Sequence, residues 1–151
     1  MPRHDERRVL PHTPEQMFDL VADVARYPEF LPWCAALRIK SREMLPDGRE
    51  LLVADMVASF KGFEERFTSR VTLNRAALQI DVAYVDGPFH HLDNRWHFEP
   101  AGEGATRVHF VIDFAFKSRL LASVAGLVFG RVVTRMTDAF EARARRLYAG
   151  G

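Results

Sequence analysis

The sequence lacks the features that stabilise small secreted proteins or anchor membrane proteins. Cys34 is the single cysteine among 151 residues, so an internal disulfide cannot form and nothing indicates an oxidising compartment. Residues 1–8 are charged and have no apolar segment of the kind that signal peptides contain. The charge-free stretch at residues 120–130 is about half of the roughly 20 residues that a membrane span needs. We therefore expect a cytoplasmic protein, at most in peripheral contact with the inner face of the membrane.

Motifs of common catalytic and metal sites are also missing. The chain has no Gly-x-Ser-x-Gly nucleophile elbow, no His-Glu-x-x-His zinc motif and no Gly-rich phosphate loop. His90 and His91 follow Gly87 and Pro88, a setting more typical of a surface loop than of a metal site. Glu65 has no second catalytic group to act with. We expect no catalytic residue, no metal, no required cofactor and no enzymatic activity.

An excess of charge of one sign is absent as well. The chain has 21 Lys and Arg residues against 20 Asp and Glu residues, a net charge of +1. Such a balance gives no strong general attraction to nucleic acid, and we expect no DNA partner. The length suits one domain, residues 1–151. Phenylalanine is unusually abundant, with 12 residues.

The C-terminal part of the chain predicts one helix of about 30 residues, 118–148, far longer than the globular mean of about 11–12. Its apolar residues recur at helical spacing: Leu120, Val124, Leu127, Val128, Met136, Phe140, Ala144 and Leu147. Because its first half is apolar almost all round, another part of the chain must cover it. Its second half carries charged residues for a solvated face.

The preceding residues predict a sheet able to cover that helix. Thr13, Pro14 and Gln16 form a helix-start signal with a capping box, after a short strand at residues 7–10. The period then changes from helical to two, which predicts six strands near residues 37–41, 52–60, 63–73, 78–84, 92–98 and 108–116. Short turns between them favour an antiparallel meander, with the first strand added beside the last. The fold class is α+β, with about seven strands curved around the long helix.

Alternation along these strands predicts which residues face the helix. The inner face collects Met56, Phe60, Phe63, Phe67, Trp96, Phe98, Phe110, Phe114 and Phe116. Glu65, Ser69 and Asn94 share this face, although an unpaired buried polar group costs roughly 1–3 kcal/mol. Two interpretations stay open. The three residues bind one another or a trapped water in an ordinary core, or they surround the polar head of a ligand in an apolar cavity.

Several motifs resemble one known family. The octapeptide Tyr-Pro-Glu-Phe-Leu-Pro-Trp-Cys at residues 27–34 is similar to the signature of the coenzyme Q-binding START-like proteins, within the polyketide cyclase/dehydrase-like superfamily. The resemblance extends over nearly the whole chain. It includes Phe63, Glu65, Phe67, Ser69, Val71, Asp86, Gly87, Pro88, Phe89, Leu92, Asn94, Trp96, Phe98, Phe114, Phe116, Ala139, Phe140, Glu141, Arg143 and Ala144.

The resemblance implies a helix-grip fold with a cavity between the sheet and the long helix. It implies non-enzymatic binding of ubiquinone or a similar isoprenoid lipid, as a carrier or chaperone that supports respiration. Some relatives are described as ribosome-association toxins, which bind the large ribosomal subunit and block subunit joining, and this is the alternative function. A cyclase-like enzyme is a third, less favoured function.

Two hypotheses about the cavity follow. We expect Phe67, Trp96, Phe110 and Phe114 to line a tunnel with Val124 and Val128, which a spacing of four places on one side of the helix. We also expect residues 27–33, with Phe30, Trp33 and Phe89, to flank its mouth and touch a bilayer, because aromatic side chains favour interfaces. The complete set of expected ligand-binding residues is Phe30, Trp33, Met56, Phe60, Phe63, Glu65, Phe67, Ser69, Phe89, Asn94, Trp96, Phe98, Phe110, Phe114, Val124 and Val128.

Overall fold

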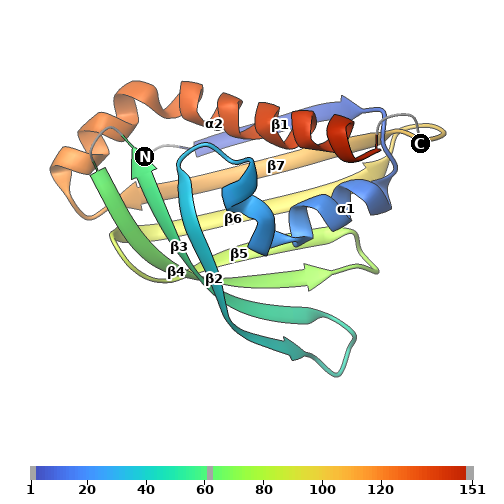
Figure 1. Ribbon diagram of the computed structural model, residues 1–151, viewed down its shortest axis with the longest axis horizontal. Helices are drawn as coiled ribbons and strands as arrows, with labels where there is room; N and C mark the ends of the chain where they lie inside the picture. The colour runs from blue at the N-terminus through green and yellow to red at the C-terminus, as the bar shows by residue number, and fades with distance from the viewer. Residues whose placement is uncertain (1–2, 61–62, 149–151) are drawn as a thin grey trace.

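The computed structural model describes residues 3–60 and 63–148, and within them the side chains of residues 60, 63, 121 and 124–130 are left aside. Three helical segments and seven strands follow one another along the chain (Figure 1). The elements are β1 (Arg3–Leu10), α1 (Pro14–Ala22), the 3-10 helix η1 (Val24–Glu29), β2 (Cys34–Met44), β3 (Glu50–Phe60), β4 (Phe63–Asn74), β5 (Gln79–Asp86), β6 (Phe89–Pro100), β7 (Thr106–Phe116) and α2 (Arg119–Tyr148). This order confirms the predicted one.

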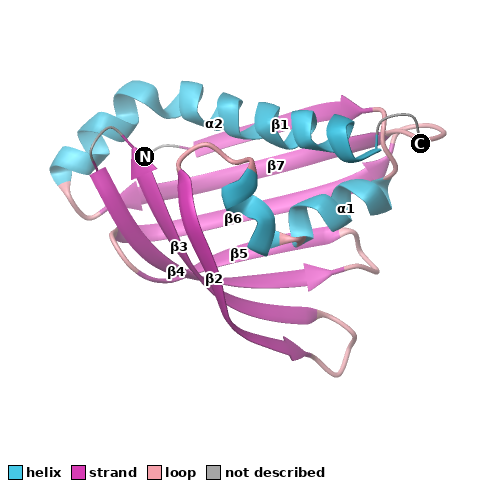
Figure 2. Ribbon diagram, in the orientation of Figure 1, coloured by secondary structure: helices cyan, strands magenta, loops and turns pink. Residues whose placement is uncertain are grey.

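All seven strands belong to one antiparallel sheet, in the order β1-β7-β6-β5-β4-β3-β2. Consecutive strands β2 to β7 are neighbours, and β1 pairs with β7, as the turn signals and the alternation predict. The helices lie on one face of the curved sheet, while its other face is free of helices (Figure 2). The structure therefore has the helix-grip architecture, a curved sheet wrapped around a long C-terminal helix.

The first helix begins where its capping signal predicts. The backbone N–H of Gln16 donates to Thr13 Oγ1 at 3.1 Å, and the Gln16 side chain accepts from the Thr13 N–H at 2.9 Å. Pro14 occupies the first helical turn, where its missing N–H costs no hydrogen bond. Met17 and Phe18 are buried on the face that meets the sheet. This short helix therefore packs on the sheet beside the C-terminal end of α2, where the Tyr148 hydroxyl donates to the Gln16 carbonyl at 3.1 Å.

Strand β1 is longer than the sequence predicts, beginning at Arg3 instead of Arg7. Its register with β7 pairs Glu6 with Phe110 and Arg8 with Val108, so these charged residues share the inner face. Charged residues occupy both faces of the strand, which removes the apolar alternation that identifies strands in a sequence. The pairing is carried by the backbone, and only the structure reveals it.

The second half of α2 is fixed to the sheet by aromatic packing and by an ionic contact. The ring of Phe140 lies 5.0 Å from Trp96 of β6 and 5.4 Å from Tyr27 of η1. Arg8 of β1 donates to Glu141 Oε1 at 2.9 Å. The helix begins at Arg119, one residue after the predicted start. Of the helices in residues 3–60 and 63–148, none is sufficiently long and apolar to cross a membrane.

Candidate ligand-binding site

The strand register places the expected aromatic residues on the face of the sheet that α2 covers. Met56 lies opposite Phe67, Trp96 lies opposite Phe110, and Phe114 lies opposite Leu92. Residues directly opposite in antiparallel strands point to the same face. The inner-face assignment made from alternation is therefore confirmed for these residues, whereas their contact with a ligand stays a prediction.

The inner-face aromatic residues divide into two clusters. The first surrounds Phe140, where Trp96 lies 4.5 Å from Phe110 and 6.2 Å from Phe98, and all of them are buried. Residues of the second cluster lie towards the other end of the sheet: Phe67, Tyr84, Phe89, Leu92, Ile112, Phe114 and Phe116. Phe67 and Phe114 thus lie in a different cluster from Trp96 and Phe110, although the sequence places all four in one tunnel.

Phe89 is the centre of the second cluster. Its ring stacks on Phe116 at 4.6 Å and meets Phe67 edge-on at 5.3 Å and Phe114 at 5.8 Å. Its exposed fraction is 7%, so the expectation that Phe89 touches a bilayer is wrong. The Tyr84 hydroxyl, which accepts from the Phe89 backbone N–H, fixes the start of β6 and turns the ring inward.

Ser69 and Asn94 each place a buried polar oxygen on the inner face of the sheet. Ser69 Oγ and Asn94 Oδ1 are both buried, and neither has a hydrogen-bond partner among the described residues. Ser69 pairs with Tyr84 and Asn94 with Val82, so the two residues lie on opposite sides of β5. Two strand spacings, about 10 Å, separate them. Ser69 and Asn94 therefore do not bind one another directly, which leaves a trapped water or a ligand as their partner.

Glu65 lies further along the same face. It pairs with Ala58 of β3 and stands four residues from Ser69, a distance of about 13 Å along an extended strand. Its side chain is half-buried. Glu65 thus points to the same side as Ser69 but does not contact it directly.

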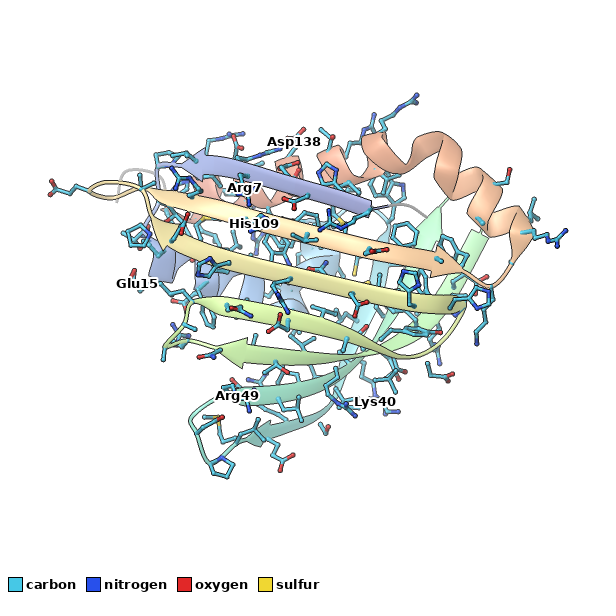
Figure 3. The ribbon with its side chains drawn as sticks, turned by 180° about the vertical axis from the view of Figure 1, so that it is seen from behind. Arg7, Glu15, Lys40, Arg49, His109 and Asp138 are labelled. Atoms are coloured by element: carbon cyan, nitrogen blue, oxygen red, sulfur yellow. The ribbon has the colours of Figure 1, made fainter. Side chains whose placement is uncertain are left out.

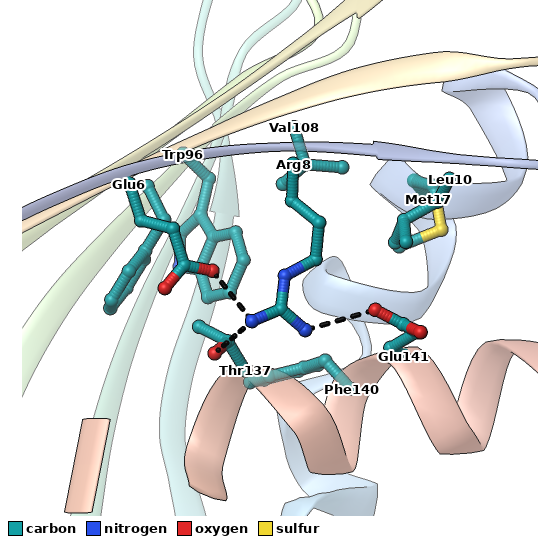
Figure 4. A pocket seen from close by; sticks show the side chains of 10 residues that line it. Glu6, Arg8, Leu10, Met17, Trp96, Val108, Thr137, Phe140 and Glu141 are labelled. Carbon is teal, nitrogen blue, oxygen red and sulfur yellow. Dashed lines mark hydrogen bonds and ion pairs between the residues drawn. The ribbon is translucent and has the colours of Figure 1, made fainter. Parts of the chain in front are cut away.

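A small pocket lies between β1 and α2 at the first cluster (Figure 4). Its volume of about 20 Å³ holds about one water molecule. Its lining residues include Trp96 and Phe110 from the expected set, with Glu6, Arg8, Leu10, Met17, Val108, Thr137, Phe140 and Glu141. The sequence interpretation missed the polar members, because the charge alternation of β1 hides which residues face inward.

Arg8 holds the polar side of this pocket together. It lies 3.0 Å from Glu6 on its own strand, and it also donates to Asp138 at 3.0 Å and to Thr137 at 3.1 Å on the helix. These hydrogen bonds to carboxylates raise the pKa of Arg8 against the opposing effect of burial. The guanidinium therefore stays charged and links the sheet edge to α2.

The segment expected at the cavity mouth has mixed roles. Tyr27 donates from its hydroxyl to the Val21 carbonyl, and burial raises its pKa. Phe30 packs on Phe140 at 5.4 Å, with the Arg143 guanidinium 5.1 Å above its ring. These aromatic residues hold η1 against α2, so they contribute to the packing of the fold.

Trp33 and Cys34 follow that segment. Trp33 has a positive φ of 67°, which is uncommon for a bulky residue, and its carbonyl accepts from the Ser59 N–H at 2.9 Å. Cys34 is buried, which raises the pKa of its thiol to about 11 and suits the role of a small apolar residue.

Four expected ligand-binding residues lie outside the described side chains. Phe60 and Phe63 end the paired part of β3 and β4, where their backbones lie opposite each other. Val124 and Val128 fall in the first half of α2, whose backbone is helical. Their place in a tunnel stays a prediction.

Comparisons with known proteins agree with this architecture. The family described as polyketide cyclase / dehydrase and lipid transport matches residues 10–141, and the chain belongs to this family. It is 36% identical to the ribosome association toxin RatA of Rickettsia prowazekii, over 93% of this chain and 94% of that protein. It is 33% identical to the coenzyme Q-binding protein COQ10 homolog B, mitochondrial, of Xenopus laevis, over 96% of this chain and 59% of that protein.

A solved structure extends the likeness to the fold. The 18 kDa protein CC1736 of Caulobacter crescentus is 39% identical and has a TM-score of 0.81, with 99% of this chain and 100% of that chain covered. A START superfamily protein of Mycobacterium smegmatis, at 20% identity and a TM-score of 0.80 over 96% of this chain and 98% of that chain, shows the fold alone. The START-like resemblance of residues 27–34 is thereby confirmed, as is the helix-grip fold.

Proposed function

We propose that this protein binds an isoprenoid quinone, ubiquinone or a close relative, between the inner face of the sheet and α2. The observation that carries the proposal is the burial of Ser69 Oγ and Asn94 Oδ1 on an aromatic face, where neither atom has a hydrogen-bond partner among the described residues. Leaving such groups unpaired costs roughly 1–3 kcal/mol each. A bound head group that offers hydrogen-bonding oxygens removes that cost.

The chemistry of the two side chains suits a quinone. The Ser69 hydroxyl donates directly to a quinone carbonyl, and the Asn94 amide donates once it is rotated to place its nitrogen inward. The second cluster, centred on Phe89, offers ring edges and faces to the ring and tail of the ligand. Glu65 donates only when protonated or through a water molecule.

The role in this proposal is that of a carrier or chaperone, with no catalysed reaction and no required cofactor. Support comes from the relative named as a coenzyme Q-binding protein. Peripheral membrane contact through Trp33 belongs to the same proposal, because a lipid ligand has to enter from a bilayer. Trp33 is half-buried and lies directly before the start of β2.

Lipid extraction from the purified protein, followed by mass spectrometry, tests the proposal. We expect a quinone at a substantial fraction of one molecule per chain. The Val124→Trp variant should lose it at little cost in stability, since the space it fills holds ligand and not core. Extracts without any isoprenoid lipid, together with no uptake of added ubiquinone, would contradict the proposal.

Association with the large ribosomal subunit is the second candidate. The specific observation in its favour is the identity of 35–36% to relatives named ribosome association toxin RatA, in Rickettsia prowazekii and Pseudomonas aeruginosa, over at least 93% of this chain. Sucrose gradients with added protein test it. Unchanged peaks of free subunits and joined ribosomes at high protein excess would exclude it.

A further inference from the structure

Helix α2 has a charge quite different from that of the remaining chain. It holds six of the 21 basic residues and two of the 20 acidic ones, a net charge of +4. The remainder of the chain has 15 basic and 18 acidic residues, a net charge of −3. The near-neutral total therefore conceals a basic helix on a mildly acidic body.

The exposed arginines form a stripe on the outward side of the second half of α2. Arg131, Arg135, Arg145 and Arg146 are all exposed, and Arg131 and Arg135 stand one helical turn apart. From Arg131 to Arg146 the stripe is about 22 Å long, at about 1.5 Å per residue. It faces away from the sheet, since the buried residues Val133, Phe140 and Ala144 occupy the opposite side of the helix.

The two carboxylates of α2 leave most of this stripe uncompensated. Both Asp138 and Glu141 are bound by Arg8, which reaches them from β1 at 3.0 and 2.9 Å. Arg145 shares Glu141 at 3.0 Å. Within the part of the chain that the structure describes, Arg131, Arg135 and Arg146 have no carboxylate within 4 Å.

The arginines of β6 and β7 show the opposite arrangement. On its outer face, seen in Figure 3, Arg95 lies 2.7 Å from Asp81 and Arg107 lies 3.0 Å from Glu99. His109 lies 2.8 Å from Asp5 on the same face. Cations on β6 and β7 are therefore paired, which supplies a matched comparison for the unpaired arginines of α2.

We infer that the outward stripe of α2 binds the phosphate backbone of RNA, an inference that rests on the ribosomal candidate function. All four cations are arginines, whose guanidinium groups bind phosphate in a bidentate manner and stack on bases. Helix dipole stabilisation accounts for Arg145 and Arg146 in the last turn, but it does not account for Arg131 and Arg135 in the middle of the helix.

The residues between the arginines favour RNA over a lipid surface. The remaining outward positions are Thr134, Asp138 and Ala142, all exposed. Helices that lie in a membrane interface bury large apolar side chains beside their basic residues. This stripe offers no such anchor between residues 131 and 146, whereas it offers phosphate-binding arginines towards both of its ends.

The test compares two variants with equal change in charge. Arg131→Gln with Arg135→Gln removes the middle of the stripe and keeps good helix formers. Arg95→Gln with Arg107→Gln removes two arginines from the outer face of the sheet. Binding to purified bacterial large ribosomal subunits and to protein-free large-subunit RNA is measured across a range of KCl concentrations, with circular dichroism as the check on folding.

We expect the parent protein to bind both probes, with log affinity falling by about 3 per log unit of salt for four phosphate contacts. The α2 variant should bind roughly tenfold more weakly, and its slope should fall by about 1.5 because two of the four contacts are removed. The sheet variant should match the parent. Equal affinities for parent and α2 variant, or equal losses for both variants, would overturn the inference.

Two further outcomes separate the inference from the function on which it rests. A parent protein that binds neither subunits nor RNA would exclude the ribosomal function itself. Vesicles of phosphatidylglycerol and phosphatidylcholine serve as the second arm. Vesicle binding that the α2 variant loses, without any RNA binding, would assign the stripe to membranes and overturn the RNA inference.

Discussion

Arg8 of β1 and Glu141 of α2 are joined by a hydrogen bond of 2.9 Å between Arg8 Nη1 and Glu141 Oε1. The contact links residues 133 positions apart and fastens the first strand to the last helix. Its surroundings are partly buried, with 24% of the Arg8 side chain and 30% of the Glu141 side chain exposed. Removing one partner of such a pair is destabilising, because the remaining charge still bears the free-energy cost of being partly buried.

Replacing Arg8 should therefore destabilise the fold. Arg8→Met keeps an unbranched apolar stem but removes the guanidinium that contacts both Glu6 and Glu141, although Glu141 keeps its contact with Arg145. We expect a loss of about 2 kcal/mol in the free energy of unfolding, measured with urea. The control is Arg7→Met on the exposed outer face, with an expected change within about 0.5 kcal/mol. Equal effects of the two substitutions would show that the Arg8 contacts are solvated and weak.

Gly87 should tolerate no side chain. Its φ is +144°, and a Cβ there would lie 2.6 Å from the Cβ of Phe67. Gly87→Ala should cost about 2 kcal/mol or more, because both a backbone shift and a strained φ are imposed on the turn before β6. Gly102→Ala is the matched control, with a φ of +101° but open space around it. Thermal unfolding that shifts equally for both variants would mean that backbone strain alone matters.

The thiol of Cys34 should react slowly in the folded protein. Burial raises its pKa from the ordinary 9.0 to about 11, which lowers the thiolate fraction at pH 8 by roughly a hundredfold. Because the folded state holds this proton more tightly, the thiol favours folding below about pH 9, and this contribution is lost as the pH rises through about 11. Iodoacetamide labelling of native protein and of protein in urea measures the difference. A native rate equal to the unfolded rate would contradict the burial of the thiol.

Trp33 should carry the peripheral membrane contact. Trp33→Asn keeps a residue that tolerates positive φ but removes the interfacial aromatic ring. We expect flotation with liposomes to fall several-fold while circular dichroism stays unchanged. Val9→Asn changes an apolar residue that is 58% exposed on β1 and should leave flotation unaffected. If Trp33→Asn floats as well as the parent, the membrane contact lies elsewhere or does not exist.

Sequence reasoning predicted elements where periodicity and local signals agree. The capping box at Thr13 and Gln16, the alternation of β3, β4, β6 and β7, and the 30-residue length of α2 were all readable from the sequence. It failed for the first half of β1, whose charged residues follow no apolar period, and for the inward burial of Phe89, which depends on a bulge between residues 89 and 91.

The candidate site was predictable in part. Alternation placed Ser69 and Asn94 on the inner face, which the register confirms. Their separation across β5 could not be deduced, because it depends on strand register and not on periodicity. The division of the aromatic residues between Trp96 and Phe89 was equally hidden, since it follows from where Phe140 meets the sheet.

The unpartnered hydroxyl of Ser69 provides the most direct test of the proposed function. Ser69→Ala is measured twice, by urea unfolding of ligand-free protein and by binding of a ubiquinone analogue. Because the buried hydroxyl has no partner within residues 3–60 and 63–148 as described, its removal should leave the free energy of unfolding unchanged or raise it by up to about 1 kcal/mol. Binding should weaken at least about fivefold through the lost hydrogen bond. A less stable variant that binds the quinone as well as the parent does would contradict the account, because Ser69 would then belong to an ordinary core.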